Sequence, residues 1–223
     1  TIGEYISPTL AKVFYIASSG RPWPVLVYIT KDAQFEKLDF SYEKCTAVRS
    51  FQPKPKLNAD QLQAASKLLN EAKKPLMIVG QGIMLSNAEE ELRAFAEKTG
   101  VPVASTLMGL GAFPANHTQF VGMVGMHGNY APNVKSNECD VLLAVGMRFD
   151  DRVTGDVSRY AKQAKVVHID IDAAEINKII KADAPVLADA KEALAFLTDL
   201  VEKQNHQSWL DEFHQAKENE LQV

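Results

Sequence analysis

The chain has 223 residues, of which 46% are hydrophobic and 23% charged, a composition typical of a globular protein with one sizeable core and an appendage. A net charge of -4 without any run of lysines and arginines argues against nucleic acid as a partner, and no apolar run approaches the ~20 residues of a membrane span. Two cysteines far apart in the sequence, Cys45 and Cys139, indicate neither a disulfide framework nor a zinc site and favour a reducing, cytoplasmic compartment.

The N-terminal segment is predicted to be the end of a preceding domain. A helix with an apolar stripe is expected from its N-cap at Ser7 to the vicinity of Gly20, and residues 25–29 form a β-rich run typical of an edge strand. One helix and one strand cannot bury themselves, so residues 1–35 are expected to complete a domain whose remainder lies in a longer polypeptide. The first residue is Thr1 rather than methionine, which favours the same interpretation.

A second domain is predicted over residues 58–203, after a linker over residues 36–57 that mixes charges with prolines and shows no periodicity. Asn58 is the expected N-cap of its first helix, with Gln61 as the capping-box partner. Helical and strand patterns then alternate with short joints, which is typical of right-handed βαβ crossovers. The sequence therefore predicts an α/β fold, a parallel six-stranded sheet with helices on both faces.

The remaining elements of this domain are expected at strand-like and helix-like runs in regular alternation. In chain order they are a strand at 76–79, a helix from Ser86 (with Glu89 as cap partner) to Gly100, strands at 102–105 and 120–122, helical residues at 130–138, strands at 140–145 and 165–172, a short helix from Ala173, a strand at 185–187 and a long helix from Asp189. In the tail, residues 204–223, Trp209, Leu210 and Phe213 share one possible helical face. That face either packs on the domain or extends toward a third domain outside this chain.

The strand at 140–145 is followed by the most unusual stretch of the chain. Gly146 ends a fully apolar run, and Arg148, Asp150, Asp151 and Arg152 follow it within five positions. These charges could simply pair with one another in a solvated loop. Open α/β sheets, however, bind ligands at the carboxyl ends of their strands, where this loop would lie, and that position favours a binding function.

Other strand ends carry residue types that suit a nucleotide-like ligand. Gly80-Gln81-Gly82 lets the backbone approach a phosphate, although a plain βα turn explains the pair of glycines equally well, and the third glycine of a dinucleotide fingerprint is replaced by Leu85. The glycine-rich loop after Thr106, like the one from Gly122 to Gly128, offers exposed amides and methionines. His127 in the second loop is more typical of a hydrogen-bonded structural residue than of a catalyst.

Acidic residues end the last two strands. Asp170 and Asp172 could accept hydrogen bonds from a ribose or ribityl hydroxyl, and Asp189 occupies the same kind of position, where a helix N-cap is the alternative role. Glycine, acid or arginine thus stands at five strand ends, and their convergence on one rim predicts a cofactor site. No catalytic triad, metal cluster or Walker loop is recognisable, so the chain is interpreted as a cofactor-binding domain without catalytic machinery of its own.

Three segments resemble the central domain of the catalytic subunit of acetohydroxyacid synthase, also called acetolactate synthase. They are residues 146–155 (Gly-Met-Arg-Phe-Asp-Asp-Arg-Val-Thr-Gly), 125–128 (Gly-Met-His-Gly) and 168–172 (His-Ile-Asp-Ile-Asp). Residues 14–22 resemble the end of the preceding pyrimidine-binding domain of that family. The family usually has glycine and aspartate where this chain has Trp23 and Tyr28, so the first segment is expected to be altered or packed differently.

The resemblance implies a thiamine-diphosphate-dependent transferase that condenses two 2-oxoacids with loss of CO₂, in branched-chain amino acid biosynthesis. In the family the central domain holds FAD, whereas thiamine diphosphate and magnesium bind through an activating glutamate and a Gly-Asp-Gly motif that are not found in this chain. The whole subunit is expected to form a homodimer or tetramer, with a regulatory small subunit as a further partner. This chain alone is expected to bind flavin weakly or not at all and to catalyse nothing.

By motif, the flavin-lining residues implied by the resemblance are Gly80, Gln81, Gly82, Thr106, Leu107, Met108, Gly125, Met126, His127, Gly146, Arg148, Asp150, Arg152, Val153, Asp170 and Asp189. Asp151 and Arg152 would face the substrate channel, with Arg152 attracting the carboxylate of the second substrate. The alternatives are another thiamine-diphosphate carboligase or oxidase, a non-enzymatic FAD or adenine-nucleotide binding module, and a structural domain that has lost its ligand.

Overall fold

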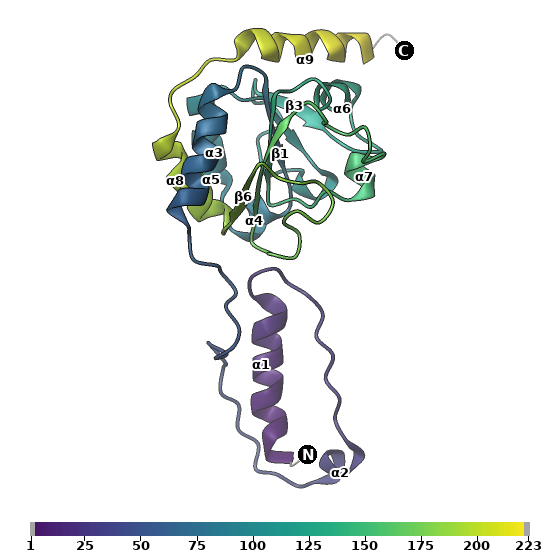
Figure 1. The fold of residues 1–223 in the computed structure, drawn as a ribbon. Helices are drawn as coiled ribbons and strands as arrows, with labels where there is room; N and C mark the ends of the chain where they lie inside the picture. The colour runs from purple at the N-terminus through teal and green to yellow at the C-terminus, as the bar shows by residue number, and fades with distance from the viewer. Residues whose placement is uncertain (1–2, 221–223) are drawn as a thin grey trace. The chain divides into compact units, whose positions relative to one another are not determined.

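The computed structural model describes residues 3–220, which divide into one unit that ends at Pro55 and a second that begins at Lys56. The first unit contains a short 3-10 turn, Gly3–Tyr5, and helix α1 (Ile6–Ser18), then an extended segment that leads to α2 (Lys31–Phe35). Figure 1 shows α1 as the long purple helix of this unit. Tyr15 and Phe51 pack edge to face within it, with ring centroids 6.1 Å apart.

The strand expected at residues 25–29 is wrong, because the described part of the first unit, residues 3–55, forms no strand there. The side chains of Leu26 and Tyr28 are 94% and 86% exposed. A strand needs a neighbour that satisfies its backbone hydrogen bonds and covers one face, and a high β-propensity does not supply one. The N-cap of α1 is Tyr5 rather than Ser7, whose hydroxyl donates to the carbonyl of Ser41 instead.

The second unit is built on a six-stranded parallel sheet, as the sequence predicts. Its strands are β1 (Pro75–Val79), β2 (Val103–Ser105), β3 (Phe120–Met123), β4 (Val141–Val145), β5 (Lys165–Asp170) and β6 (Ala184–Leu187). Their spatial order is β3-β2-β1-β4-β5-β6, so the order reverses between β1 and β4. In a doubly wound sheet this reversal is where the connections on either side diverge and a ligand crevice opens beyond the strand ends.

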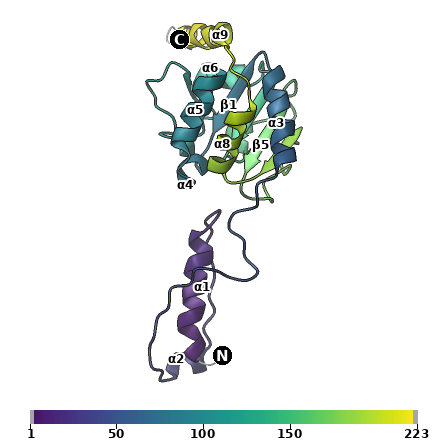
Figure 2. The same ribbon diagram turned by 90° about the vertical axis from the view of Figure 1, so that its left-hand side faces the viewer.

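Helices cover both faces of the sheet. One face is covered by α3 (Ala59–Glu71), α4 (Gly82–Leu85), α5 (Glu89–Thr99) and α8 (Ala190–Leu200), and the other by α6 (Tyr130–Lys135), α7 (Asp151–Thr154) and α9 (Gln207–Glu220). Figure 2 shows α3, α5 and α8 together on one side of the sheet. Alternate residues of β4 enter different cores, Leu143 with the first group and Leu142 with the second. Burial on both faces explains why β1 and β4 are uninterrupted apolar runs.

The start of α3 is confirmed, whereas its capping box, the start of α5 and the helix expected after residue 172 differ from the prediction. Asn58 caps α3 by accepting from the backbone N–H of Asp60, but the side chain of Gln61 accepts from the N–H of Leu187 instead of completing a capping box. Ser86 is the C-cap of α4 rather than the start of a helix, and its hydroxyl donates back to the carbonyl of Gly82; α5 begins only at Glu89, after Asn87 at φ +51°. The stretch after residue 172 forms turns rather than a helix.

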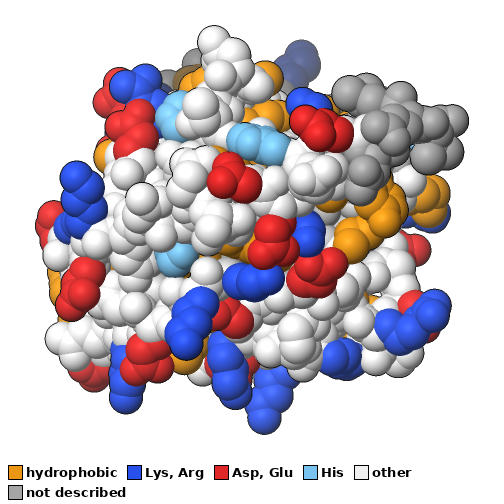
Figure 3. All heavy atoms as spheres, turned by 90° about the horizontal axis from the view of Figure 1, so that it is seen from above, with side chains coloured by type: hydrophobic (Ala, Val, Ile, Leu, Met, Phe, Trp, Pro, Cys, Tyr) orange, Lys and Arg blue, Asp and Glu red, His pale blue; other side chains and the backbone are white. Residues whose placement is uncertain are grey.

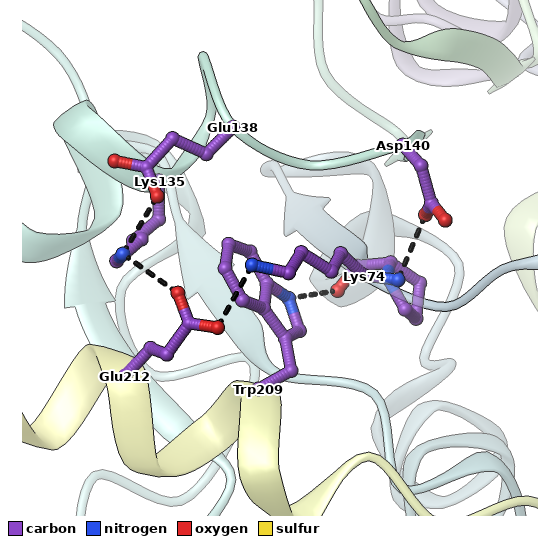
Figure 4. Close-up of polar contacts among 7 residues, drawn as sticks. Lys74, Lys135, Glu138, Asp140, Trp209 and Glu212 are labelled. Carbon is purple, nitrogen blue, oxygen red and sulfur yellow. Dashed lines mark hydrogen bonds and ion pairs between the residues drawn. The ribbon is translucent and has the colours of Figure 1, made fainter.

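The tail packs on the domain through α9. Trp209 of α9 is buried against the domain, and its indole N–H donates to the carbonyl of Pro75 at 2.9 Å. Figure 4 shows Glu212 bridging the ammonium groups of Lys74 and Lys135, at 2.8 and 3.0 Å, beside the indole ring. The two lysines lie 4.7 and 5.3 Å from the ring centroid, within reach of cation–π attraction.

The molecular surface seen from above carries acidic and basic side chains side by side (Figure 3). Neither sign of charge dominates this face. No helix within residues 3–220 combines the length and the apolar character that crossing a bilayer would take.

Candidate functional site

The sheet brings the predicted site residues to the carboxyl ends of its strands. At the reversal point, the backbone N–H of Gly80 donates to Val145 at 3.0 Å and that of Gly82 donates to Gly146 at 2.9 Å. A Cβ on Gly80 would lie 2.3 Å from the Gly146 carbonyl oxygen, and one on Gly82 would lie 2.6 Å from the Gly146 Cα. Gly146 itself has φ +58°, so glycine suits it. The loops after β1 and β4 therefore meet backbone to backbone.

The loop after β2 joins the same edge. The N–H of Thr106 donates to the carbonyl of Val79 at 2.9 Å, and a Cβ on Gly109 would lie 2.3 Å from that carbonyl oxygen. Leu107 and Met108 form the short 3-10 turn η2 (Leu107–Gly109), and their side chains are exposed. The backbone of this loop therefore packs against the end of β1, while the side chains of Leu107 and Met108 point outward.

The loop after β3 reaches back toward α7. Gly125 has φ +105°, and a Cβ there would lie 2.6 Å from the carbonyl oxygen of Arg152. The N–H of Met126 donates to that same carbonyl at 2.8 Å. Asn133 accepts from the N–H of Gly125 and donates to its carbonyl, at 2.8 and 2.9 Å, so a side chain on α6 clamps the loop. His127 is exposed on this loop.

The charged loop after β4 pairs in part with itself, which is one of the two roles that the sequence leaves open. The Arg148 Nε lies 3.1 Å from the Asp150 Oδ2, which is the pairing expected of a solvated loop. Asp150 also caps α7, because its Oδ1 accepts from the N–H of Arg152 at 3.0 Å. Asp151 and Arg152 are exposed and Val153 is half-buried, while Arg148 is exposed at the rim of the strand ends.

The acids after β5 and β6 are buried. The Asp170 Oδ1 accepts from the N–H of Asp172 at 2.8 Å, and the carbonyl of Asp170 accepts from Ala188 at 3.0 Å. Asp189 is the N-cap of α8, accepting from the N–H of Lys191 at 3.1 Å, so its capping role is confirmed.

Hydrogen bonds link all six strand ends in spatial order. Val124 donates to Ser105, Thr106 to Val79, Gly82 to Gly146, Gly146 to Ile169 and Ala188 to Asp170. The predicted residues therefore occupy one edge of the sheet rather than scattered sites. Leu85, the last residue of α4, and Leu110, in the loop after β2, also lie at this edge and were not predicted, since an exposed leucine carries no recognisable sequence signal. Asn133 was missed because it acts from α6, through hydrogen bonds to the backbone of Gly125.

This edge combines exposed apolar side chains with close-packed backbone. Large apolar side chains that are 47% to 64% exposed gather on α4 and on the segments after β2 and β3, namely Leu85, Leu107, Met108, Leu110 and Met126. The loops after β1 and β4 combine close-packed glycine backbone with a cationic side chain, as a pyrophosphate requires. The hydroxyl of Ser105, buried at the end of β2, has no hydrogen-bond partner within residues 3–220. The described residues hold no group of three or more metal-binding side chains.

The chain belongs to the thiamine pyrophosphate enzyme central domain family, whose model matches residues 62–197. It is 46% identical over 211 residues to the acetolactate synthase large subunit of Corynebacterium glutamicum, which covers 92% of this chain and 34% of that protein. It is 45% identical over 204 residues to the acetolactate synthase of Mycobacterium leprae, covering 92% and 32%. The resemblance seen in the motifs is thereby confirmed, and the chain spans about a third of the length of these relatives.

A solved structure supports the fold. The X-ray structure of a protein from Mycobacterium smegmatis, described as a thiamin diphosphate-dependent enzyme, superposes with a TM-score of 0.72 at 22% identity. The match covers 92% of this chain and 38% of that one. At this level of identity the likeness shows the fold alone.

Proposed function

We propose that this chain is the flavin-binding central part of an acetolactate synthase large subunit. The whole protein would condense two 2-oxoacids with decarboxylation, giving acetolactate or acetohydroxybutyrate for branched-chain amino acids. The identity to acetolactate synthases over nine-tenths of the chain supports the activity. The observation that carries the flavin site is the backbone-to-backbone contact of Gly82 and Gly146 at the strand-order reversal, beside an exposed apolar rim.

Each part of the edge has a proposed role toward FAD. The amides near Gly80, Gln81, Gly82 and Gly146, together with Arg148, would bind the pyrophosphate. Asp170 and Asp189 would accept hydrogen bonds from ribose or ribityl hydroxyls. The apolar side chains on the loops of Thr106, Leu107, Met108, Gly125, Met126 and His127 would cover the rings, with Asp150 and Val153 completing the wall on the side of α7.

The reaction itself requires groups outside the described residues. Thiamine diphosphate supplies the electron sink for decarboxylation and carbon–carbon bond formation. Magnesium and thiamine diphosphate would be held by other parts of a longer polypeptide, as the resemblance to acetolactate synthases implies. What this chain would contribute is the guanidinium of Arg152, exposed beside Asp151, which matches the carboxylate of an incoming 2-oxoacid.

We further propose an assembly and a location. The Corynebacterium glutamicum relative is called a large subunit, which supports a smaller regulatory companion, and the whole subunit would form a homodimer or tetramer. Both Cys45 and Cys139 are free thiols, which supports a reducing, cytoplasmic location.

A domain exchange tests the flavin proposal. The matching segment of the Corynebacterium glutamicum large subunit is replaced by this chain, and FAD content and acetolactate formation are measured in the purified chimera. We expect bound FAD and acetolactate. A chimera carrying Gly82→Val should lose FAD, whereas Gly111→Ala, where a Cβ meets nothing within 4 Å, should retain it.

The outcomes separate the alternatives. A folded chimera that binds thiamine diphosphate but retains no FAD would overturn the flavin site. FAD without acetolactate would favour a non-enzymatic flavin module or a different thiamine-diphosphate carboligase. The 223-residue chain alone is expected to show weak or no flavin binding and no acetolactate, so carboligation by the isolated chain would contradict the proposed division of labour.

A further inference from the structure

His168 is a buried ionisable side chain that is not among the residues proposed to bind FAD. It lies in β5, paired in register with Ala144 of β4, and its side chain is fully buried. Burying a histidine lowers the stability of the fold unless its ring nitrogens form hydrogen bonds. The contacts of this ring therefore show which part of the structure it stabilises.

The imidazole contacts the charged loop after β4. Its Nε2 lies 2.9 Å from the carbonyl oxygen of Met147, and its ring packs edge to face on Phe149, with centroids 5.0 Å apart at 69°. The same Nε2 lies 3.9 Å from the Asp170 Oδ2. The ring therefore contacts the loop after β4 and lies near the carboxyl end of its own strand, β5, and both carry predicted flavin-binding residues.

The contacts define the protonation state of the ring. The Met147 carbonyl can only accept, so Nε2 carries the hydrogen and donates it. Nδ1 has no partner within residues 3–220, and a second buried N–H there would be left without an acceptor. Burial also lowers the pKa of His168, which favours the neutral ring. His168 is thus a neutral, Nε2-protonated donor.

The loop that it holds alternates between buried and exposed side chains. Met147 and Phe149 point into the core, whereas Arg148 and Asp150 point outward and pair with each other. The chain turns out of β4 at Gly146, with φ +58°, just before this alternation begins. Fixing the Met147 carbonyl and the Phe149 ring therefore fixes which side of the loop Arg148 and Asp150 occupy.

We propose that His168 is the positioning residue of the loop from Gly146 to Asp150, which it holds through the Met147 carbonyl so that Arg148 and Asp150 face the ligand at the strand ends. It acts through the loop and does not touch the ligand. The assignment of that ligand as FAD rests on the proposed function, but the anchoring of the loop does not.

Limited trypsin digestion of the 223-residue chain tests the anchoring directly. His168→Phe keeps a ring against Phe149 and removes the donor, whereas His168→Gln places an amide N–H near the position of Nε2. We expect cleavage after Arg148 and Arg152, relative to Arg93 within α5, to rise about tenfold in His168→Phe. His168→Gln should restore most of the protection.

Val167→Ala is the matched control, because Val167 is buried in the same strand but belongs to the core on the opposite face. It should lower stability and leave the cleavage ratio unchanged. If His168→Phe raises cleavage at all arginines alike, as Val167→Ala would, His168 is only a core residue and the proposal fails.

A spectroscopic measurement on the unmodified chain keeps the test independent of folding in the variants. Long-range proton–nitrogen NMR spectra of the imidazole should show the Nε2-protonated neutral tautomer, and an Nδ1-protonated ring would overturn the proposal. In the chimera, His168→Phe should weaken FAD binding about tenfold, with partial recovery in His168→Gln. Should the unsubstituted chimera bind no FAD, the proposed function fails, while the digestion and NMR results still decide the anchoring.

Discussion

Close backbone approach at the reversal of the strand order makes Gly80 hard to replace. A methyl group there would lie 2.3 Å from the Gly146 carbonyl oxygen and 2.5 Å from the Met147 Cβ, and both belong to a loop that is fixed on its other side. Contacts this short force backbone movement in a well-packed region.

Gly80→Ala is accordingly expected to lower the free energy of unfolding by about 1–3 kcal/mol. Urea denaturation followed by circular dichroism measures the change. Gly111→Ala is the control, because its Cβ meets nothing within 4 Å and only the strain of φ +94° remains; that strain costs about 1–2 kcal/mol, so Gly111→Ala should lose less stability than Gly80→Ala. Equal losses in the two variants would show that the contact with Gly146 is not limiting.

The two thiols should differ in reactivity. Burial raises the pKa of Cys139 to about 12, and its thiol donates to the carbonyl of Ser136 at 3.2 Å, so little thiolate forms at neutral pH. Cys45 is only half-buried. Iodoacetamide should therefore modify Cys45 in the folded chain and Cys139 only in urea, as peptide mass spectrometry would show. Labelling of Cys139 ahead of Cys45 under native conditions would contradict this.

Helix α9 is attached to the domain mainly through one buried aromatic side chain, Trp209. Trp209 packs edge to face on Phe213, with centroids 5.0 Å apart, and supports the lysine pair described above. Most of the attachment energy should reside in this buried side chain rather than in the exposed ion pairs.

Trp209→Ala should lower the free energy of unfolding by about 3–5 kcal/mol, because it leaves a large cavity under α9. Glu212→Gln, which removes only the partly exposed ion pairs, should cost less than about 1 kcal/mol. Thermal and urea unfolding of both variants provide the comparison. A larger loss from Glu212→Gln would mean that charge, not burial, attaches the helix.

The strands were predictable because each is a local run of apolar residues buried on both faces. The helix starts were less so, since they depend on distant partners. Gln61 looked like a cap residue but accepts from Leu187, more than a hundred positions away. The turns after residue 172 include Asn177 at φ +61°, a conformation that interrupts a helix and that composition does not reveal.

For the whole molecule, burial couples folding to the protonation of histidine. Desolvation lowers the pKa of both His168 and His206 below the ordinary value of 6.5. Below that pH the unfolded chain binds more protons than the folded one, so stability is present above pH 6.5 and is lost as the pH falls. The lowered pKa values of Asp183 and Glu212 add a further loss below about pH 4.

The free energy of unfolding should therefore fall between pH 7 and pH 5, before the carboxylates are protonated. Urea denaturation at half-unit steps of pH measures the slope. His206→Gln removes one of the two groups and should flatten the curve in this window without changing its shape below about pH 4. A profile that is flat from pH 7 to 5 would show that neither histidine is buried in its neutral form.

Only part of the candidate site could be predicted from the sequence. Glycines and acids at strand ends could be listed because the parallel sheet places all such ends on one edge. Asn133 and His168 escaped notice because they act from a helix and from inside a strand, through hydrogen bonds to the backbone carbonyls of Gly125 and Met147. The roles of the listed residues toward FAD remain predictions.

Arg152 contributes to the fold through its backbone and to the proposed site through its side chain. It is the carbonyl of Arg152 that ties α7 to the loop of the edge strand, and every amino acid carries that carbonyl. Replacing the Arg152 side chain therefore leaves the hydrogen bond from Met126 in place. If Arg152 has the proposed role toward the 2-oxoacid carboxylate, position 152 is a place where substrate choice could diverge among related chains while the backbone around it stays the same.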